Sequence, residues 1–189
     1  MSKKKVGVLA LQGDFEAHKN ALERAGAEAI EVRSAEDLRN IDGLIIPGGE
    51  SSTMMKLLDE EKLLQPIAGF GQSKPIFGTC AGAILLASDV SNPVQKSLGL
   101  MDISVQRNAY GRQLDSRIAR LHPVGFDRDL EAVFIRAPII RRTGPDAKVL
   151  AKYQDDPVLV EQGRHLAATF HPELTADPRI HLMFLRKIP

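Results

Sequence analysis

The chain has 189 residues, which is enough for one domain spanning residues 1–189 and too few for two full domains. Lys plus Arg number 25 against 24 Asp plus Glu, a balance that excludes the strong charge of a nucleic-acid or membrane-surface binder. The apolar run Val6–Leu11 is too short for a signal peptide, and no segment approaches the roughly 18 apolar residues of a membrane span. The single cysteine permits no internal disulfide bond, so we expect a cytoplasmic protein that binds neither nucleic acid nor membrane.

The first half of the chain alternates short apolar runs with helix-like segments. The expected strands are Val6–Leu11, Ala29–Val32, Gly43–Ile46 and Lys74–Phe77. The expected helices are Phe15–Ala25, a short helix opened by a capping box at Ser34–Asp37, a helix capped by Ser51, Ser52 or Thr53 and ending near Leu58, and Ala81–Ala87. Strand–helix alternation with apolar strands predicts a mostly parallel central sheet covered by helices on both faces.

The second half consists mainly of strand-like segments. They are Met101–Val105, Ser116–Leu121, Ala132–Arg136, Lys148–Tyr153, Val158–Gln162 and His165–Phe170. A turn near Gly163 joins the last two segments into an expected antiparallel hairpin. Asp177 and Pro178 match an N-cap and the first residue of a helix that runs to about Leu185. No repeat or linker divides the chain, so the expected fold is one α/β domain with added antiparallel strands.

Cys80 lies in the segment Gly78-Thr79-Cys80-Ala81-Gly82, between an expected strand and an expected helix. This is the G-x-nucleophile-x-G pattern of a nucleophile elbow, in which small flanking residues allow a strained turn. The start of the helix favours a thiolate, and the backbone N–H of Ala81 is placed to stabilise an oxyanion. The alternative is that Cys80 is a small buried apolar residue, as many free cysteines are.

A cysteine nucleophile needs a base, and His171 is the histidine best placed to be one. It follows the apolar strand that ends at Phe170, and Glu173 lies two residues further on, where a carboxylate can hold the imidazole in one tautomer. The alternative for His171-Pro172-Glu173 is an exposed turn before a helix. The other four histidines are expected in partly exposed helical positions, a loop and a hairpin turn: His18, His181, His122 and His165.

Two further groups are candidates for contacts with a substrate. Gly48 and Gly49 follow an expected strand, and adjacent glycines allow backbone N–H groups to approach a ligand and complete an oxyanion hole with Ala81. The alternative is an ordinary tight turn. Arg107 and Arg136 can grip a substrate carboxylate through two hydrogen bonds, although most arginines are simply solvated.

Together these motifs carry a resemblance to a known family. Gly48-Gly49-Glu50-Ser51, the Cys80 elbow and His171-Pro172-Glu173 resemble the class I (triad) glutamine amidotransferases. Four further blocks resemble the PdxT family, the glutaminase subunits of pyridoxal 5′-phosphate synthase: Leu9–Gly13, Arg107–Gln113, Phe134–Pro138 and His171–Leu174. The block Arg107–Gln113 is the most specific of them. One departure is Ala17 before His18, where the family usually has Glu, and it bears on partner contacts.

The resemblance implies a flavodoxin-like fold and specific roles for the residues that match. Cys80 would be the nucleophile, with His171 and Glu173 completing the triad. The expected glutamine contacts are Gly48, Gly49, Glu50, Ser51, Arg107, Ile135 and Arg136, and Gln12 would lie near the oxyanion region and the partner interface. The partner would be a PdxS-type (β/α)8 synthase subunit, in an assembly of about twelve plus twelve subunits, as in that family.

The function expected from residues and resemblance is hydrolysis of L-glutamine to glutamate and ammonia through a thioester on Cys80, without a metal or cofactor. The ammonia would pass to the synthase subunit for vitamin B6 biosynthesis. Two alternatives stay open: a glutaminase subunit that serves a different synthase, and a non-catalytic regulatory subunit on the same fold.

Overall fold

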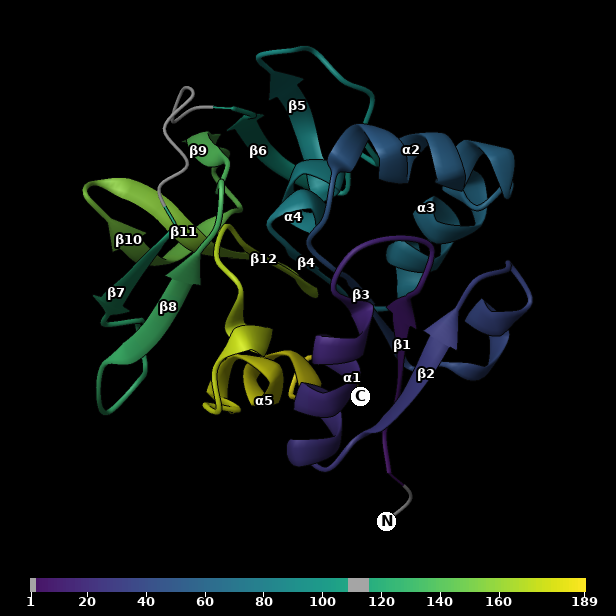
Figure 1. The fold of residues 1–189 in the computed structure, drawn as a ribbon, viewed down its shortest axis with the longest axis horizontal. Helices are drawn as coiled ribbons and strands as arrows, with labels where there is room; N and C mark the ends of the chain where they lie inside the picture. The colour runs from purple at the N-terminus through teal and green to yellow at the C-terminus, as the bar shows by residue number, and fades with distance from the viewer. Residues whose placement is uncertain (1–2, 109–115) are drawn as a thin grey trace.

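The computed structural model describes residues 3–108 and 116–189. A seven-stranded sheet lies at its centre (Figure 1). In spatial order its strands are β10 (Lys148–Tyr153), β11 (Asp156–Gln162), β12 (His165–Ala168), β4 (Ile76–Thr79), β3 (Gly43–Ile46), β1 (Lys5–Leu9) and β2 (Glu28–Val32). The five strands from β12 to β2 are parallel, whereas β10 and β11 add to the β12 edge in antiparallel fashion.

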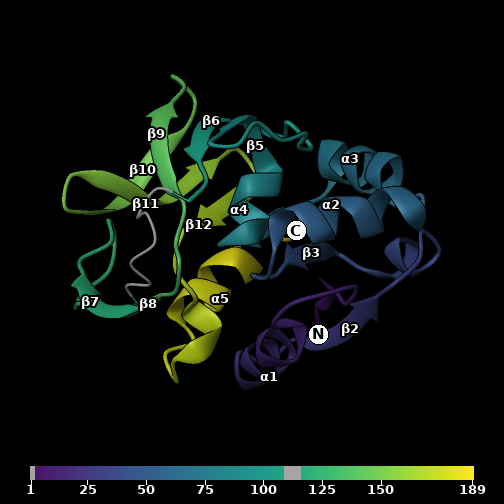
Figure 2. The same cartoon turned by 45° about the horizontal axis from the view of Figure 1, so that its top comes forward.

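Helices cover both faces of this sheet, as Figures 1 and 2 show. One face carries α1 (Phe15–Arg24) and α5 (Arg179–Leu185), and the other carries α2 (Ser51–Glu60), α3 (Leu64–Ser73) and α4 (Ala81–Leu86). Strand residues alternate between the two cores: Ile45 packs with the α1–α5 side, whereas Leu44 and Ile46 pack with the α2–α4 side. This alternation is the period of two expected for a strand buried on both faces.

Smaller elements complete the chain. A three-stranded sheet contains β5 (Ala87–Ser91), β6 (Met101–Gln106) and β9 (Ile139–Thr143), and a two-stranded sheet contains β7 (Arg117–Leu121) and β8 (Leu130–Phe134). Two 3-10 turns are η1 (Asp37–Asn40) and η2 (Pro172–Leu174). The expected α/β fold with added antiparallel strands is therefore confirmed. Within the described residues, no helix combines the length and the apolar character that a membrane crossing requires.

Several element boundaries differ from the sequence predictions. The last expected residue of β8, Arg136, has φ 45°, which an extended strand cannot contain, so β8 ends earlier, at Phe134. The capping box at Ser34 is half formed: Asp37 accepts from the backbone N–H of Ser34 at 2.8 Å, but the turn that follows is 3-10. Helix α5 begins at Arg179, whose backbone N–H donates to Asp177 at 3.0 Å.

The N-cap of α2 differs from the sequence prediction of Ser51, Ser52 or Thr53, which is wrong. The N-cap is Glu50, whose carboxylate accepts from the backbone N–H groups of Ser52 and Thr53 at 3.0 and 2.7 Å. A carboxylate at this position satisfies two helix N–H groups and also opposes the positive end of the helix dipole. Glu50, predicted only as a glutamine contact, therefore also holds the start of α2.

Helix α3 and strands β5 and β9 are absent from the sequence predictions. Pro66 and two glycines argue against a helix over 64–73. Pro66, however, is the third residue of α3, where the missing N–H has no helical partner in any case. Gly71 makes room for a neighbouring side chain, because a Cβ there would lie 2.6 Å from Leu100 Cδ1.

Candidate active site

The loops that follow four strands of the central sheet meet at its carboxyl edge. Ile46 at the end of β3 pairs with Gly78 on β4, and Thr79 pairs with Ala168 at the end of β12. The next residues along the chain are the Gly48–Gly49 loop, Cys80 and His171, so residues distant in sequence become neighbours. Ligand sites of open α/β sheets form at this edge.

Cys80 lies in the strained turn between β4 and α4. Its φ and ψ are 49° and −104°, outside the allowed regions for ordinary residues, and its N–H is anchored to Ala168 O at 2.8 Å. A Cβ at Gly78 would lie 2.4 Å from the Gly82 backbone, and a Cβ at Gly82 would lie 2.0 Å from Ile46 O. Both glycines of the elbow are therefore required by close backbone packing, as the motif predicts.

His171 and Glu173 form a buried pair beside this cysteine. The Nδ1 atom of His171 lies 2.7 Å from Glu173 Oε1, and both residues are buried. A Cβ at Gly48 would lie 2.5 Å from His171 Cε1 and 3.5 Å from Cys80 Cβ, so the glycine lets base and nucleophile approach the same loop. In the described part of the chain, no group hydrogen-bonds to the buried Nε2 of His171, which leaves this atom available for proton transfer.

The surroundings of His171 favour its charged form. Burial alone would lower the pKa of His171, but its interactions with the nearby Cys80 sulfur and with the Glu173 carboxylate outweigh burial and raise the pKa to about 10. An imidazolium beside a sulfur nucleophile is the arrangement that supports a thiolate. The site can therefore hold a nucleophile and a proton donor at the same time.

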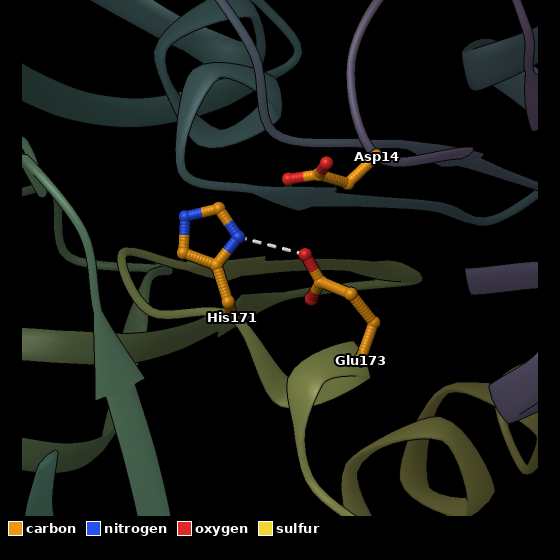
Figure 3. Close-up of side chains that lie close together, drawn as sticks. All are labelled: Asp14, His171 and Glu173. Atoms are coloured by element: carbon orange, nitrogen blue, oxygen red, sulfur yellow. Dashed lines mark hydrogen bonds and ion pairs between the residues drawn. The ribbon is translucent and has the colours of Figure 1, made fainter. Parts of the chain in front are cut away.

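Figure 3 shows Asp14 beside the His171–Glu173 pair. Ligand atoms of these three residues lie within 4.8 Å of one another, close enough to consider a metal ion. The Nδ1 atom of His171 is already bonded to Glu173, so a metal ion that took this nitrogen would displace the contact that orients the imidazole. The expectation that no metal takes part stays a prediction.

The glycine loop after β3 is held by the loop after β1. Gln12 Oε1 accepts from the backbone N–H of Glu50 at 3.1 Å, and Gly48 O accepts from the N–H of Asp14 at 3.2 Å. Gly49 has φ 151°, and a Cβ there would lie 2.3 Å from Gln12 Oε1. Because a trans peptide places C=O and the next N–H on opposite sides, the Gly49 N–H points away from the Asp14 loop.

A cavity of about 290 Å³ opens beside Cys80. Its lining contains Gly49, Glu50, Ser51, Cys80, Ala81, Ile84, Arg107, Asn108, Arg136 and Pro138. Inside it, the Arg107 guanidinium donates to Ser52 Oγ at 2.7 Å and lies 3.3 Å from the Glu50 carboxylate. The cavity thus presents a thiol, a cation and an anion within one small space, which suits a zwitterionic amino acid.

A glutamine amidotransferase family model, described as the SNO glutamine amidotransferase family, matches residues 8–189. The chain belongs to this family. Among curated relatives, the "Pyridoxal 5′-phosphate synthase subunit PdxT" of Solibacter usitatus is 62% identical, covering 98% of this chain and 100% of the relative. The PdxT subunit of Koribacter versatilis is 55% identical, covering 97% and 95%. The resemblance predicted from the sequence motifs is confirmed.

Solved structures agree with the family assignment. A crystal structure of a glutamine amidotransferase superposes with a TM-score of 0.92 at 49% identity, covering 97% of this chain and 98% of that one. PurLQS from Thermotoga maritima superposes with a TM-score of 0.74 at 18% identity and full coverage of both chains, a likeness that concerns the fold alone.

Most glutamine-contact residues expected from the family line the cavity, and two do not. Gly48 contacts the catalytic pair instead, and Ile135 turns its backbone carbonyl toward Cys80, 3.9 Å from Sγ. Three lining residues were not predicted, namely Ile84, Asn108 and Pro138. Of the block Arg107–Gln113, residues 109–113 lie outside the described residues.

The prediction that His18 and His181 are partly exposed is wrong, because both are fully buried. His165 is buried as well, and its Nδ1 atom accepts from the Ile76 N–H at 3.2 Å. A signal for the first two was present in this family member's sequence. Both precede apolar residues by three and four positions, which places them on the buried face of their helices.

Proposed function

We propose that this family member hydrolyses L-glutamine to glutamate and ammonia at Cys80, as the glutaminase subunit of a pyridoxal 5′-phosphate synthase. The observation that carries the proposal is the shared edge of the sheet. There, the strained Cys80 lies beside His171. The Nδ1 atom of His171 is hydrogen-bonded to the Glu173 carboxylate, and its Nε2 atom lacks a hydrogen-bond partner among the described residues. We further propose that residues 1–189 act as one domain.

In the first half of the reaction, the Cys80 thiolate attacks the side-chain carbonyl carbon of glutamine. A C–S bond forms and the carbonyl oxygen becomes an oxyanion. His171 Nε2–H then donates its proton to the amide nitrogen, the C–N bond breaks, and ammonia leaves. Glutamate is left attached to Cys80 as a thioester.

In the second half, neutral His171 accepts a proton from water at Nε2, and the resulting hydroxide attacks the thioester carbon. Collapse of this intermediate breaks the C–S bond, releases glutamate and restores the thiolate beside the imidazolium. Glu173 holds Nδ1–H throughout, which keeps Nε2 facing the reacting atoms.

The oxyanion forms where the backbone N–H groups of Ala81 and Gly49 converge. Ala81 follows the nucleophile directly, and the Gly49 N–H is turned away from the Asp14 loop by the peptide geometry described above. For the substrate backbone, Arg107 and Arg136 suit the α-carboxylate, and the Glu50 carboxylate suits the α-ammonium. The Ile135 carbonyl lies near the position of the reacting amide.

The names of the curated relatives, which are subunits of pyridoxal 5′-phosphate synthase, support the proposal of a synthase partner. We propose a PdxS-type (β/α)8 synthase subunit as the acceptor of ammonia, in an assembly of about twelve plus twelve subunits in the cytoplasm. Gln12 would transmit docking to the oxyanion loop, because its side chain accepts from the Glu50 N–H.

The test combines turnover with chemical trapping. Ammonia and glutamate release from L-glutamine is measured for wild type and Cys80→Ser, with and without the synthase, and an electrophilic glutamine analogue labels the wild-type protein. The expected result is turnover that requires Cys80 and the partner, with the label on the peptide containing Cys80. Glutamine turnover by Cys80→Ser, or a label elsewhere, would overturn the assignment.

A further inference from the structure

A chain of buried polar side chains continues from the catalytic pair into the protein core. His18 on α1 places Nε2 at 3.4 Å from Glu173 Oε2 and at 2.9 Å from Thr79 Oγ1. Its other nitrogen, Nδ1, lies 3.0 Å from Nε2 of His181 on α5. His18, His181 and Thr79 are completely shielded from solvent. Buried polar groups of this kind are costly unless they are paired, so the arrangement calls for a role.

The contacts determine which nitrogens carry protons. Glu173 faces His18 with an oxygen that has no hydrogen-bond partner among the described residues, so a lone pair on His18 Nε2 would set two acceptors against each other. A proton on Nε2 removes this conflict. It is donated to Thr79 Oγ1 at 2.9 Å, and the same N–H attracts Glu173 Oε2 electrostatically over the longer distance of 3.4 Å. His18 Nδ1 is then an acceptor, and His181 Nε2–H is its donor.

The same proton assignment accounts for an unpaired atom at the far end of this group of side chains. His181 Nδ1, which is buried without a partner, becomes a lone pair rather than an N–H. Burial first, and then the charges of His181 and His171, lower the pKa of His18, while burial and Arg24 lower the pKa of His181 to about 4. Both rings are therefore neutral near pH 7, and neither competes with His171 for the charge of Glu173.

We infer that His18, oriented by His181, is a positioning residue for the triad. Its Nε2–H restrains the second oxygen of Glu173, so that the first oxygen stays on His171 Nδ1. Without this restraint the carboxylate has no other partner for Oε2 among the described residues, and it is free to rotate away from His171. The inference rests on the proposed glutaminase function.

The test uses three variants in the complex with the synthase. His18→Phe keeps a ring but removes the donor, His18→Gln restores an N–H at the position of Nε2, and His165→Phe is the control for losing a buried histidine remote from the triad. We expect His18→Phe to lower kcat by about 10- to 100-fold, as when a group that orients a functional side chain is lost, with the KM for glutamine unchanged. His18→Gln should recover most of kcat, and His165→Phe should lower Tm without changing kcat.

A spectroscopic measurement tests the same inference without turnover. Nitrogen-15 spectra of histidine-labelled wild type should show His18 and His181 as neutral Nε2–H tautomers, and His171 with a proton on Nδ1. In His18→Phe the His171 Nδ1 proton signal should shift. If His18→Phe does not fold, His18→Gln and the wild-type tautomers decide the question.

The outcomes separate the two proposals. A wild-type complex that releases no ammonia, and a Cys80 that does not react with iodoacetamide, would refute the proposed function. If wild type is active, then unchanged kcat in folded His18→Phe, failure of His18→Gln to recover activity, or Nδ1–H tautomers in both histidines would overturn the positioning role alone.

Discussion

Replacing Glu173 with Gln tests how much the buried carboxylate contributes to His171. The pair is 2.7 Å apart and shielded from solvent on both sides. Glutamine has nearly the same shape but no charge. If its amide oxygen accepts from His171 Nδ1–H, its NH₂ group faces the His18 N–H, 3.4 Å away in the wild type, and two donors oppose each other. The opposite orientation forces the proton of His171 onto Nε2, which then cannot accept one.

The expected loss follows from the geometry. A buried hydrogen bond to a charged group contributes about 1.5–3 kcal/mol, which corresponds to roughly 10- to 150-fold in kcat. In serine triads, the corresponding replacement leaves the histidine in the wrong tautomer and lowers kcat about 10⁴-fold. This loss is the upper limit here, because a thiolate needs less help from a base than a hydroxyl does. The KM for glutamine should not change, since Glu173 does not line the cavity.

The assay is steady-state glutaminase turnover with saturating synthase, for Glu173→Gln, His171→Asn and the double variant. His171→Asn should be at least as damaging, and the double variant scarcely worse, because triad members act as a unit. The control is Glu161→Gln, a partly exposed carboxylate paired with Lys187 at 2.7 Å, which should leave kcat unchanged. Wild-type kcat in Glu173→Gln, or fully additive losses, would refute the orientation of His171 by Glu173.

Four further predictions follow from the same structure. Cys80→Ala should fold and bind the synthase but release no ammonia, and measurable turnover would contradict the nucleophile. Gly82→Ala should lower Tm and abolish Cys80 labelling, since its Cβ would lie 2.0 Å from Ile46 O. The control Gly69→Ala, in the open interior of α3, should raise the free energy of unfolding by about 1 kcal/mol, and equal melting curves for the two variants would be inconsistent with a packed elbow. The isolated subunit should be a poor glutaminase, because Gln12, at the expected interface with the synthase, holds the Gly48–Gly49 loop that forms the oxyanion hole. Equal kcat/KM with and without the synthase would show that the site is already in its active form. Burial holds the pKa of His181 at about 4, below its unfolded value, so the free energy of unfolding of the wild type should fall by up to about 3 kcal/mol between pH 6.5 and pH 4. His181→Phe should lose less over this range, and parallel acid-unfolding curves for the two proteins would argue against a neutral buried histidine.

The features that sequence alone predicted well are governed by local rules. The elbow can be identified locally, because Gly78 and Gly82 crowd each other within five residues, although Gly82 also approaches Ile46 on the neighbouring strand. The His171–Glu173 contact is likewise local, because it joins residues two apart. The parallel sheet is predictable because apolar strands and helices alternate in the sequence.

The features that sequence missed depend on contacts between distant segments. His18 and His181 are 0% exposed because α1 and α5 lie on the same face of the sheet and bring them together. Within one helix, only the spacing of the apolar residues indicates this burial. Glu50 caps α2 and binds Arg107, a second role that becomes visible only when β6 lies beside this helix start. Helix α3 tolerates Gly71 because Leu100 fills the space, a compensation that no local propensity contains.

The position of β12 in the central sheet has a consequence for the newly made chain. This strand, residues 165–168, is inserted between β11 and β4, and His171 follows it after two residues. Until it leaves the ribosome, the apolar strand β4 is an open edge of the sheet, and open edges pair with other chains. Cys80 likewise lacks both the carbonyl of Ala168 that anchors its N–H and the histidine that takes up its proton. A chain truncated before His165 should therefore aggregate and leave glutamine intact, so that ammonia is released only by molecules that contain both β12 and His171.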